Sequence, residues 1–347
     1  MKQSQKLRLI GFVLIFLTLF SLLPHRLHTC DENRNTPKGQ EFLAEAPGSL
    51  DGVFIGSSYV YSFFEPPLAW EDQGIAVYNY TASGLPAAAM QYVMADCRKT
   101  QPDALYIIEI KTLLNFPKAA DLHYLFDYMP KSTNKLLAMH ACARYAGLTA
   151  GEELELYVPL FLFHSNWEAV YDNRDGSAWG LKGAGNYPMF WERYPMTEGL
   201  QPDAESLTEA QLSTLEKLLD YCDESGANVL FVATPSFVLS ENYLGQVDTL
   251  GQMITDRGYS FLNCLKPDAG PEMDPEIDYY NPGHTNIGGA AKFTDFFSAW
   301  LAEEYGFADK RGQPGWESWD SSVGQYKDVI WEFLPERYGP PPPKPEA

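Results

Sequence analysis

The sequence predicts an α/β fold, a three-layer α/β/α sandwich built around a mainly parallel β-sheet. Short runs rich in Val, Ile, Phe and Tyr alternate along the chain with longer segments of helical periodicity. Such alternation implies crossover connections, which place helices on both faces of a parallel sheet. The short runs are mostly apolar and β-rich, as is typical of strands buried on both faces. With 347 residues, of which 45% are hydrophobic, the chain is long enough to bury this core.

Five of the short runs are predicted strands, because turn-forming residues bound them and β-branched or aromatic residues fill them. They are residues 52–56, 75–80, 104–110, 228–234 and 259–263.

Helices are predicted between and after these strands. The helix from residue 208 has the clearest local signals, because Thr208 and Gln211 have the spacing of a capping box. Leu215, Leu219 and Cys222 then fall on one face of that helix. The predicted helices span about residues 86–100, 132–147, 208–223, 240–257 and 286–305.

The N-terminus has the layout of a secretory signal or signal anchor. Lys2, Lys6 and Arg8 precede an uncharged run over residues 9–23. A helix of that run rises about 22 Å, less than the roughly 30 Å of a bilayer core. No small-x-small cleavage site follows, which favours an anchor, and Cys30 lacks the small preceding residues of a lipoprotein signal. We therefore expect the rest of the chain outside the cytoplasm, either membrane-anchored or secreted.

Composition divides the remaining chain into four parts. A polar linker over residues 31–48 leads into an α/β domain over 49–308, followed by a C-terminal extension over 309–338. A Pro-rich tail over 339–347 is expected to be extended. Residues 151–205 interrupt the α/β rhythm, and we expect an insertion or lid over the sheet edge. Its aromatic residues include Trp167, Trp179, Tyr187, Phe190 and Trp191.

Charge and cysteine content exclude several function classes. A formal net charge of −21 repels phosphate backbones, so nucleic-acid binding is not expected. The five cysteines are far apart and form no Cys-x-x-Cys motif, so we expect buried thiols rather than a structural zinc site. No Gly-x-x-x-x-Gly-Lys-Ser/Thr loop supports nucleotide use, and no cofactor is expected.

Candidate catalytic residues follow the predicted strands. Ser58 comes just after the first strand, Gly84 follows the second, and His284 precedes the last helix. Because ligands of parallel α/β sheets bind at the carboxyl ends of the strands, we expect these residues to converge. A serine nucleophile needs an imidazole base and N–H donors for the oxyanion, and this set supplies both. The other five histidines lie in the targeting segment, on helical patterns or in the insertion: His25, His28, His123, His140 and His164.

These residues resemble the SGNH (GDSL-like) hydrolase superfamily. The likeness rests on Gly56-Ser57-Ser58 after a first strand, a glycine after the second, and a turn that ends in His284-Thr-Asn286. It is closest to the bacterial, N-terminally anchored branch related to the D-alanyl-lipoteichoic acid biosynthesis protein and alginate acetylation proteins. Stretches 158–167, with its His164-Ser-Asn-Trp core, 284–294 and 309–319 extend the likeness over about residues 50–320. It implies a flavodoxin-like sandwich.

The resemblance implies Ser58 as the nucleophile, His284 as the base, and the N–H groups of Ser58 and Gly84 as oxyanion donors. The family's acid normally sits three residues before the histidine, where this chain has Asn281. Asp278, three residues further back, is then expected to orient the imidazole, unless a backbone carbonyl does so. Asn281 is grouped with the oxyanion or substrate contacts.

A second departure concerns the family's Gly-x-Asn-Asp motif after the third strand, which is absent. Its asparagine contributes to the oxyanion site, and Asn115 is the best substitute, ahead of Asn79. Losing one such donor costs about 3 kcal/mol of transition-state stabilisation.

The sequence thus predicts a serine esterase or O-acyltransferase that acts through a Ser-His acyl-enzyme. Its expected substrate is an acylated glycan or another cell-envelope or extracellular polymer, and its expected membrane contact is the N-terminal helix. The alternative is a non-catalytic SGNH-like module that binds glycan or protein, which Asn281 and the absent motif favour. A metal site formed by Asp274, Asp278 and His284 is the weakest hypothesis, because no second histidine or cysteine cluster accompanies it.

Overall fold

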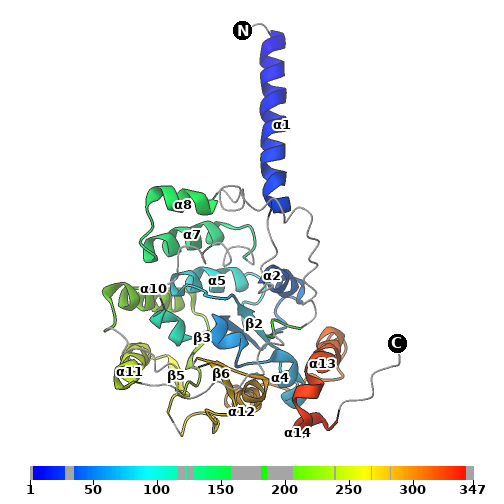
Figure 1. The fold of residues 1–347 in the computed structure, drawn as a ribbon, viewed down its shortest axis with the longest axis vertical. Coiled ribbons are helices and arrows are strands. Elements are labelled where there is room, and N and C mark those ends of the chain that lie inside the picture. The colour runs from blue at the N-terminus through cyan, green and yellow to red at the C-terminus, as the bar shows by residue number, and fades with distance from the viewer. Residues whose placement is uncertain are drawn as a thin grey trace.

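A central sheet of five parallel strands organises the protein, which we describe from a computed structural model (Figure 1). The strands are β1 (Gly52–Gly56), β2 (Val77–Thr81), β3 (Leu105–Glu109), β4 (Val229–Ala233) and β5 (Ser260–Asn263). All five match predicted runs to within two residues at either end. The structure describes residues 3–27, 35–115, 122, 129–157, 181–185, 206–237, 240–266, 268–281 and 283–340.

The strand order is β2-β1-β3-β4-β5, so β1 has β2 on one side and β3 on the other. Gly52 is aligned with both Val77 of β2 and Leu105 of β3. The chain first moves outward from β1 to β2 and then crosses back to β3. In a doubly wound sheet this reversal opens a crevice at the carboxyl ends of β1 and β3.

Helices cover both faces of the sheet, and each face has its own apolar core. Val53 and Ile55 of β1 point into the core shared with α5, α7, α10 and α11. Phe54, between them, points into the opposite core, to which Phe293 and Phe297 of α12 and Ala69 of α4 contribute. This alternation of side chains across a buried strand gives helix, sheet and helix layers, consistent with the predicted three-layer sandwich.

The predicted helices are present, and capping side chains fix the starts of all but the first of them. The capping box at Thr208 forms as predicted, and Gly226 ends that helix in the left-handed region with φ 59°. Ser132 and Ser240 cap two further long helices, one earlier and one later in the chain, by accepting backbone N–H groups. These helices are η1 (Ala87–Ala89), α5 (Met90–Cys97), α7 (Thr133–Tyr145), α10 (Glu209–Ser225), α11 (Glu241–Asp256) and α12 (Ile287–Tyr305).

Several elements were not predicted. Part of the expected polar linker is a helix, α2 (Asn35–Ala44), because Phe42 packs edge-on against Tyr78 and Tyr80 of β2. The others are α3 (Ser58–Tyr61), α4 (Pro66–Gln73), η2 (Ile110–Leu114), α8 (Ala150–Tyr157), β6 (Tyr279–Asn281), β7 (His284–Thr285), α13 (Glu317–Ile330), η5 (Trp331–Phe333) and α14 (Pro335–Tyr338).

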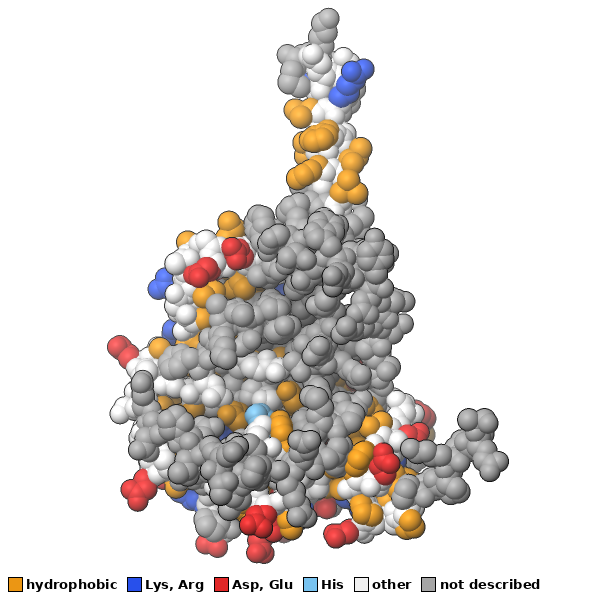
Figure 2. Space-filling view, viewed as in Figure 1, with side chains coloured by type: hydrophobic (Ala, Val, Ile, Leu, Met, Phe, Trp, Pro, Cys, Tyr) orange, Lys and Arg blue, Asp and Glu red, His pale blue; other side chains and the backbone are white. Residues whose placement is uncertain are grey.

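The N-terminal hydrophobic segment forms α1 (Gln3–Leu27), which projects from the body of the protein (Figure 1). Figure 2 shows hydrophobic side chains along this projection, and Leu14 and Phe16 are both more than half exposed. Among the residues that the structure describes, no helix is long and apolar enough to cross a membrane. The predicted membrane contact of this segment therefore stays a prediction.

One short piece of the predicted insertion lies along the outer edge of the sheet. In residues 181–185, the Lys182 carbonyl accepts a hydrogen bond from the Asn79 N–H of β2 at 3.1 Å. A Cβ at Gly183, whose φ is 81°, would lie 2.0 Å from the Asn79 carbonyl oxygen, so only glycine fits. The Lys182 ammonium donates to Glu45 at 2.7 Å, which fixes this segment to the end of α2. The predicted aromatic residues, Trp167, Trp179, Tyr187, Phe190 and Trp191, and the motif residue His164 lie outside the described residues.

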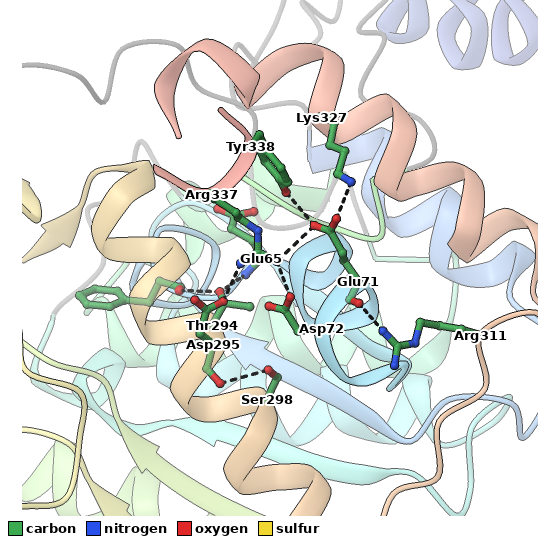
Figure 3. A network of polar contacts seen from close by, with 11 residues as sticks. Glu65, Glu71, Asp72, Thr294, Asp295, Ser298, Arg311, Lys327, Arg337 and Tyr338 are labelled. Atoms are coloured by element: carbon green, nitrogen blue, oxygen red, sulfur yellow. Dashed lines mark hydrogen bonds and ion pairs between the residues drawn. The ribbon is translucent and has the colours of Figure 1, made fainter. Parts of the chain in front are cut away.

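The predicted C-terminal extension packs onto the domain through a network of charged side chains (Figure 3). Glu71 of α4 accepts hydrogen bonds from Lys327 of α13 and from Tyr338 of α14. Arg337 of α14 forms ion pairs with Glu71, Asp72 and Asp295, the last of which belongs to α12. The extension is thus tied to the α4 and α12 side of the sandwich.

Four of the five cysteines are buried free thiols, as predicted, whereas Cys30 lies outside the described residues. These four are Cys97, Cys142, Cys222 and Cys264.

Candidate active site

The strand-to-helix turn after β1 brings Ser58 to the crevice. A Cβ on Gly56 would lie 2.5 Å from Val60 and 2.9 Å from Glu109, so the close approach of β1, α3 and β3 requires glycine. Ser57 caps α3, and Ser58 is the first residue of that helix. The side chain of Ser57 is buried, whereas Ser58 is partly accessible.

Ser58 and His284 are in hydrogen-bonding contact. The Ser58 Oγ lies 2.7 Å from His284 Nε2, although 226 positions separate the two residues in sequence. His284 reaches this point from a small antiparallel hairpin of β6 and β7, directly before α12. A serine hydroxyl at this distance from an imidazole is the arrangement that nucleophilic acyl transfer requires.

The hydrogen bond at the second imidazole nitrogen decides which nitrogen of His284 carries the proton. His284 Nδ1 lies 2.8 Å from the side-chain oxygen of Asn281, which also accepts the Gly283 N–H at 3.0 Å. A backbone N–H can only donate, so the atom that faces it is the amide oxygen, and His284 Nδ1 must donate its proton to the same oxygen. His284 Nε2 is therefore left without a proton and accepts from the Ser58 hydroxyl.

This geometry corrects the expected roles of two residues. Asp278 does not orient the imidazole: its buried carboxylate accepts the Asp274 N–H at 2.6 Å and the Lys292 ammonium at 2.8 Å. It thereby joins the hairpin to α12. Asn281 is the residue that orients His284, rather than an oxyanion or substrate contact. The spacing of three residues places Asn281 at the imidazole, because the intervening turn is closed by its own side chain.

Two tyrosine rings stack on the imidazole and cover part of its surface. Tyr59 and Tyr280 have ring centroids 5.3 and 5.5 Å from that of His284, with interplanar angles of 17° and 28°. Burial, reinforced by the nearby positive charge of Lys111, lowers the pKa of His284 to about 4. The imidazole is therefore neutral at pH 7 and available as a base.

A pocket of about 190 Å³ opens over these groups and holds four of the predicted site residues. Gly84, with φ 63°, forms one wall, and Asn115 at the end of η2 forms another. Asn79 does not reach the pocket, because its fully buried amide donates to the Phe64 carbonyl at 2.6 Å. The complete lining is Ser57, Ser58, Tyr59, Gly84, Leu85, Pro86, Asn115 and His284.

Two charged residues at the end of β3 were missed by the sequence analysis. Glu109 and Lys111 are both buried, and the Lys111 ammonium lies 4.4 Å from the centroid of the Tyr59 ring. Burial raises the pKa of Glu109, and burial, partly opposed by Glu109, lowers the pKa of Lys111 to about 8. The sequence carried only a partial signal, which is that two charged residues stand at one end of a run that is otherwise apolar.

A second and larger groove, of about 510 Å³, is lined in part by the residues that follow Pro86 in the chain. Ala87 and Ala88, which directly follow Pro86, line the groove, as do Tyr92 and Tyr145. Arg144, Lys217 and His140 also line it, and no Asp or Glu does. His140 is paired with Glu153 at 2.7 Å, in line with the structural use expected for a histidine on a helix. The groove offers aromatic and cationic contacts close to the pocket.

The metal-site hypothesis gains no geometric support from the parts of the chain that the structure describes. There, no group of three or more His, Cys, Asp or Glu side chains is arranged to hold an ion.

Comparison with known proteins leaves the chain unassigned. No family model matches the sequence, and no curated protein matches it.

Proposed function

We propose that the protein is a serine esterase or O-acyltransferase of the SGNH superfamily. The observation that carries this proposal is the relay in which Ser58 Oγ contacts His284 Nε2 and His284 Nδ1 contacts Asn281. Its position at the carboxyl ends of β1 and β3 is where a doubly wound sheet binds ligands.

Chemistry would begin with attack of Ser58 Oγ on the carbonyl carbon of an acyl ester while His284 Nε2 takes the hydroxyl proton. The tetrahedral intermediate then collapses, and the leaving alcohol receives that proton from His284. This leaves the acyl group on Ser58. Water or a sugar hydroxyl next gives its proton to His284 and attacks the acyl-enzyme, which releases either a free acid or a new ester. Hydrolysis and transfer differ only in this acceptor.

The pocket offers three donors for the oxyanion. Neither the Ser58 N–H nor the Gly84 N–H donates to a backbone carbonyl in the described residues, so both are available. The Asn115 side chain lies in the same pocket and hydrogen bonds with the Tyr59 side chain. Donors fixed in advance in this way stabilise the developing negative charge without reorganisation.

The groove favours an extended acyl carrier over a small ester. Tyr92 and Tyr145 supply surfaces for stacking, and Arg144 and Lys217 supply hydrogen-bond donors, in a groove whose lining begins at Ala87, the residue after Pro86 of the pocket. Together with the N-terminal segment, this supports action outside the cytoplasm on acyl groups of cell-envelope or extracellular polymers.

The second candidate is a non-catalytic module that binds glycan or protein through the same pocket and groove. Two observations favour it: Asn281 cannot supply the negative charge of an acid, and a base with a pKa of about 4 accepts a proton reluctantly. Under this alternative, Ser58 is a contact residue and forms no covalent intermediate.

A fluorophosphonate probe separates the two candidates. The full-length protein in detergent is labelled, the modified peptide is mapped by mass spectrometry, and Ser58→Ala and His284→Gln serve as controls. We expect labelling at Ser58 that His284→Gln suppresses. Absence of labelling in protein with a cooperative unfolding transition would favour the binding module.

A further inference from the structure

Lys111 is a buried cation that is coupled to the base through an aromatic ring. Its ammonium lies 4.4 Å from the centroid of the Tyr59 ring, and the same ring stacks on the His284 imidazole. It also lies 5.0 Å from the centroid of Phe63. Cation, tyrosine and imidazole are thus connected by direct contacts in the interior, where charges interact more strongly than in water.

The positive charge of Lys111 is not neutralised by a close ion pair. Its hydrogen bond goes to the Pro235 carbonyl at 3.0 Å, and none of the ion pairs between described residues includes Lys111. Glu109, two residues earlier, directs its carboxylate to the Thr112 N–H and hydroxyl, both at 3.1 Å. Burial also favours the protonated form of Glu109, which removes part of its negative charge.

The remaining groups around His284 do not offset this charge. Tyr59 from α3 and Tyr280 from β6 are neutral, because burial raises the pKa of each phenol. Asn281 is an uncharged amide, and the Asp278 carboxylate is paired with Lys292. A proton added to His284 would therefore meet a like charge without a compensating carboxylate.

We propose that Lys111 is a positioning residue for the base, which keeps the His284 imidazole neutral and hydrogen bonded to Ser58 in acidic surroundings. The inference rests on the proposed function of this pocket and adds the pH range over which the pocket can act. A histidine free of this influence becomes protonated near its ordinary pKa of about 6.5 and then breaks its contact with the serine hydroxyl. With Lys111 in place, the relay is retained at lower pH.

The test is an NMR titration of the His284 imidazole in the full-length protein, in which His284→Gln identifies the signal. In the wild type we expect a titration midpoint well below 6.5. Lys111→Met retains much of the length of the side chain and removes the charge, and we expect it to raise the midpoint by about one unit, a tenfold gain in proton affinity. The acid limb of kcat/KM for a neutral acetyl ester should move upward by the same amount.

A matched control is Lys310→Met. The Lys310 ammonium also lies over an aromatic ring, 4.6 Å from the centroid of Trp316, and pairs with Asp51 away from the pocket. This variant should leave the His284 midpoint unchanged. If Lys111→Met fails to fold, Glu109→Gln/Lys111→Met removes both buried charges and should raise the midpoint in the same direction.

Two results would overturn the inference: a wild-type midpoint at or above 6.5, or an unchanged midpoint in a folded variant that lacks the Lys111 charge. The proposed function fails separately, through absence of fluorophosphonate labelling at Ser58. Because the titration requires no turnover, the two failures are distinguishable.

Discussion

The amide oxygen of Asn281 accepts hydrogen bonds from both His284 Nδ1 and the Gly283 N–H. The asparagine thus holds the imidazole in the tautomer that a carboxylate would select, but supplies no negative charge to the imidazolium formed during acyl transfer. An acid at this position would both orient the imidazole and stabilise the positive charge of the imidazolium, whereas Asn281 does only the first.

Asn281→Asp should restore the missing charge. A carboxylate next to His284 favours the imidazolium, so the pKa of His284 should rise. We expect kcat for a small acetyl ester at pH 7 to increase about tenfold, less than the roughly 100- to 10,000-fold of a complete general base, because the base itself is already present. Asn281→Leu is the matched control, because it removes orientation and charge together and should lower kcat. If Asn281→Asp is slower than wild type at every pH, this role of Asn281 is contradicted.

The pH profile of the wild-type protein is a second prediction. The base must be neutral to accept a proton, and its folded-state pKa lies at about 4, below the ordinary value. Activity should therefore persist as pH falls through 6.5 and decline only near 4. The rate of fluorophosphonate labelling, followed from pH 3.5 to 8 with fluorescence to monitor folding, checks this. A decline centred at 6.5 in folded protein would be inconsistent with a buried, desolvated imidazole.

The groove predicts a difference between large and small substrates. Arg144→Gln/Lys217→Gln removes two donors that line the groove but lie outside the Ser58 pocket. We expect KM for an acetylated polysaccharide to rise several-fold, while kcat/KM for a small acetyl ester stays unchanged. Lys99→Gln, which changes a lysine that lines neither the pocket nor the groove, is the control. Equal effects on both substrates would argue against a polymer path along α7 and α10.

The sheet-edge segment makes a stability prediction. Gly183 and Gly226 both have positive φ values, of 81° and 59°. A side chain at Gly226 meets open space, whereas one at Gly183 collides with the Asn79 backbone. Gly226→Ala should cost about 1 kcal/mol of unfolding free energy from backbone strain alone, and Gly183→Ala clearly more, up to about 3 kcal/mol. Urea denaturation of both variants measures the difference, and equal costs would exclude the close approach.

The ion pairs around Arg337 include a carboxyl that should stabilise the fold more at acidic pH than at neutral pH. Partial desolvation of this half-exposed side chain, with a hydrogen bond to Asp72, raises the pKa of Asp295 to about 6. A carboxyl whose folded-state pKa is raised contributes stability that is fully present below its unfolded value of about 3.8 and is lost as pH rises through 6. Asp295→Asn should remove this step from the stability measured between pH 4 and 7. A step that persists in the variant would assign it to another group.

Much of the fold follows from local patterns, and the exceptions have a common cause. Four of the five strands are recognisable because burial on both faces leaves a largely apolar run, and the partly exposed edge strand β5 is marked by its aromatic and turn-flanked sequence. The helix α2 is not, because its sequence is polar apart from a few residues, and it is held by the packing of Phe42 on β2. Contacts between segments distant in sequence override weak local propensity there.

The candidate site, too, could be predicted only in part from the sequence. Ser58, Gly84, Asn115 and His284 could be placed together because parallel strands bring their carboxyl ends to one edge. The choice between Asp278 and Asn281 depended on the shape of a short turn, which spacing alone does not define. Lys111 was missed because a charged residue is ordinarily assigned to the surface, and only the packed interior shows that it is buried beside Tyr59.

The contact between Lys182 and Asn79 also bears on self-association. An exposed edge strand offers its N–H and carbonyl groups to the sheet of a neighbouring molecule, which is a common start of aggregation. Here the Asn79 N–H in the middle of β2 is occupied by the segment 181–185, and the left-handed backbone of Lys182, with φ 55°, cannot continue as a strand. The segment that covers this part of the β2 edge is thus too short and too kinked to pair with a further strand from a neighbouring molecule.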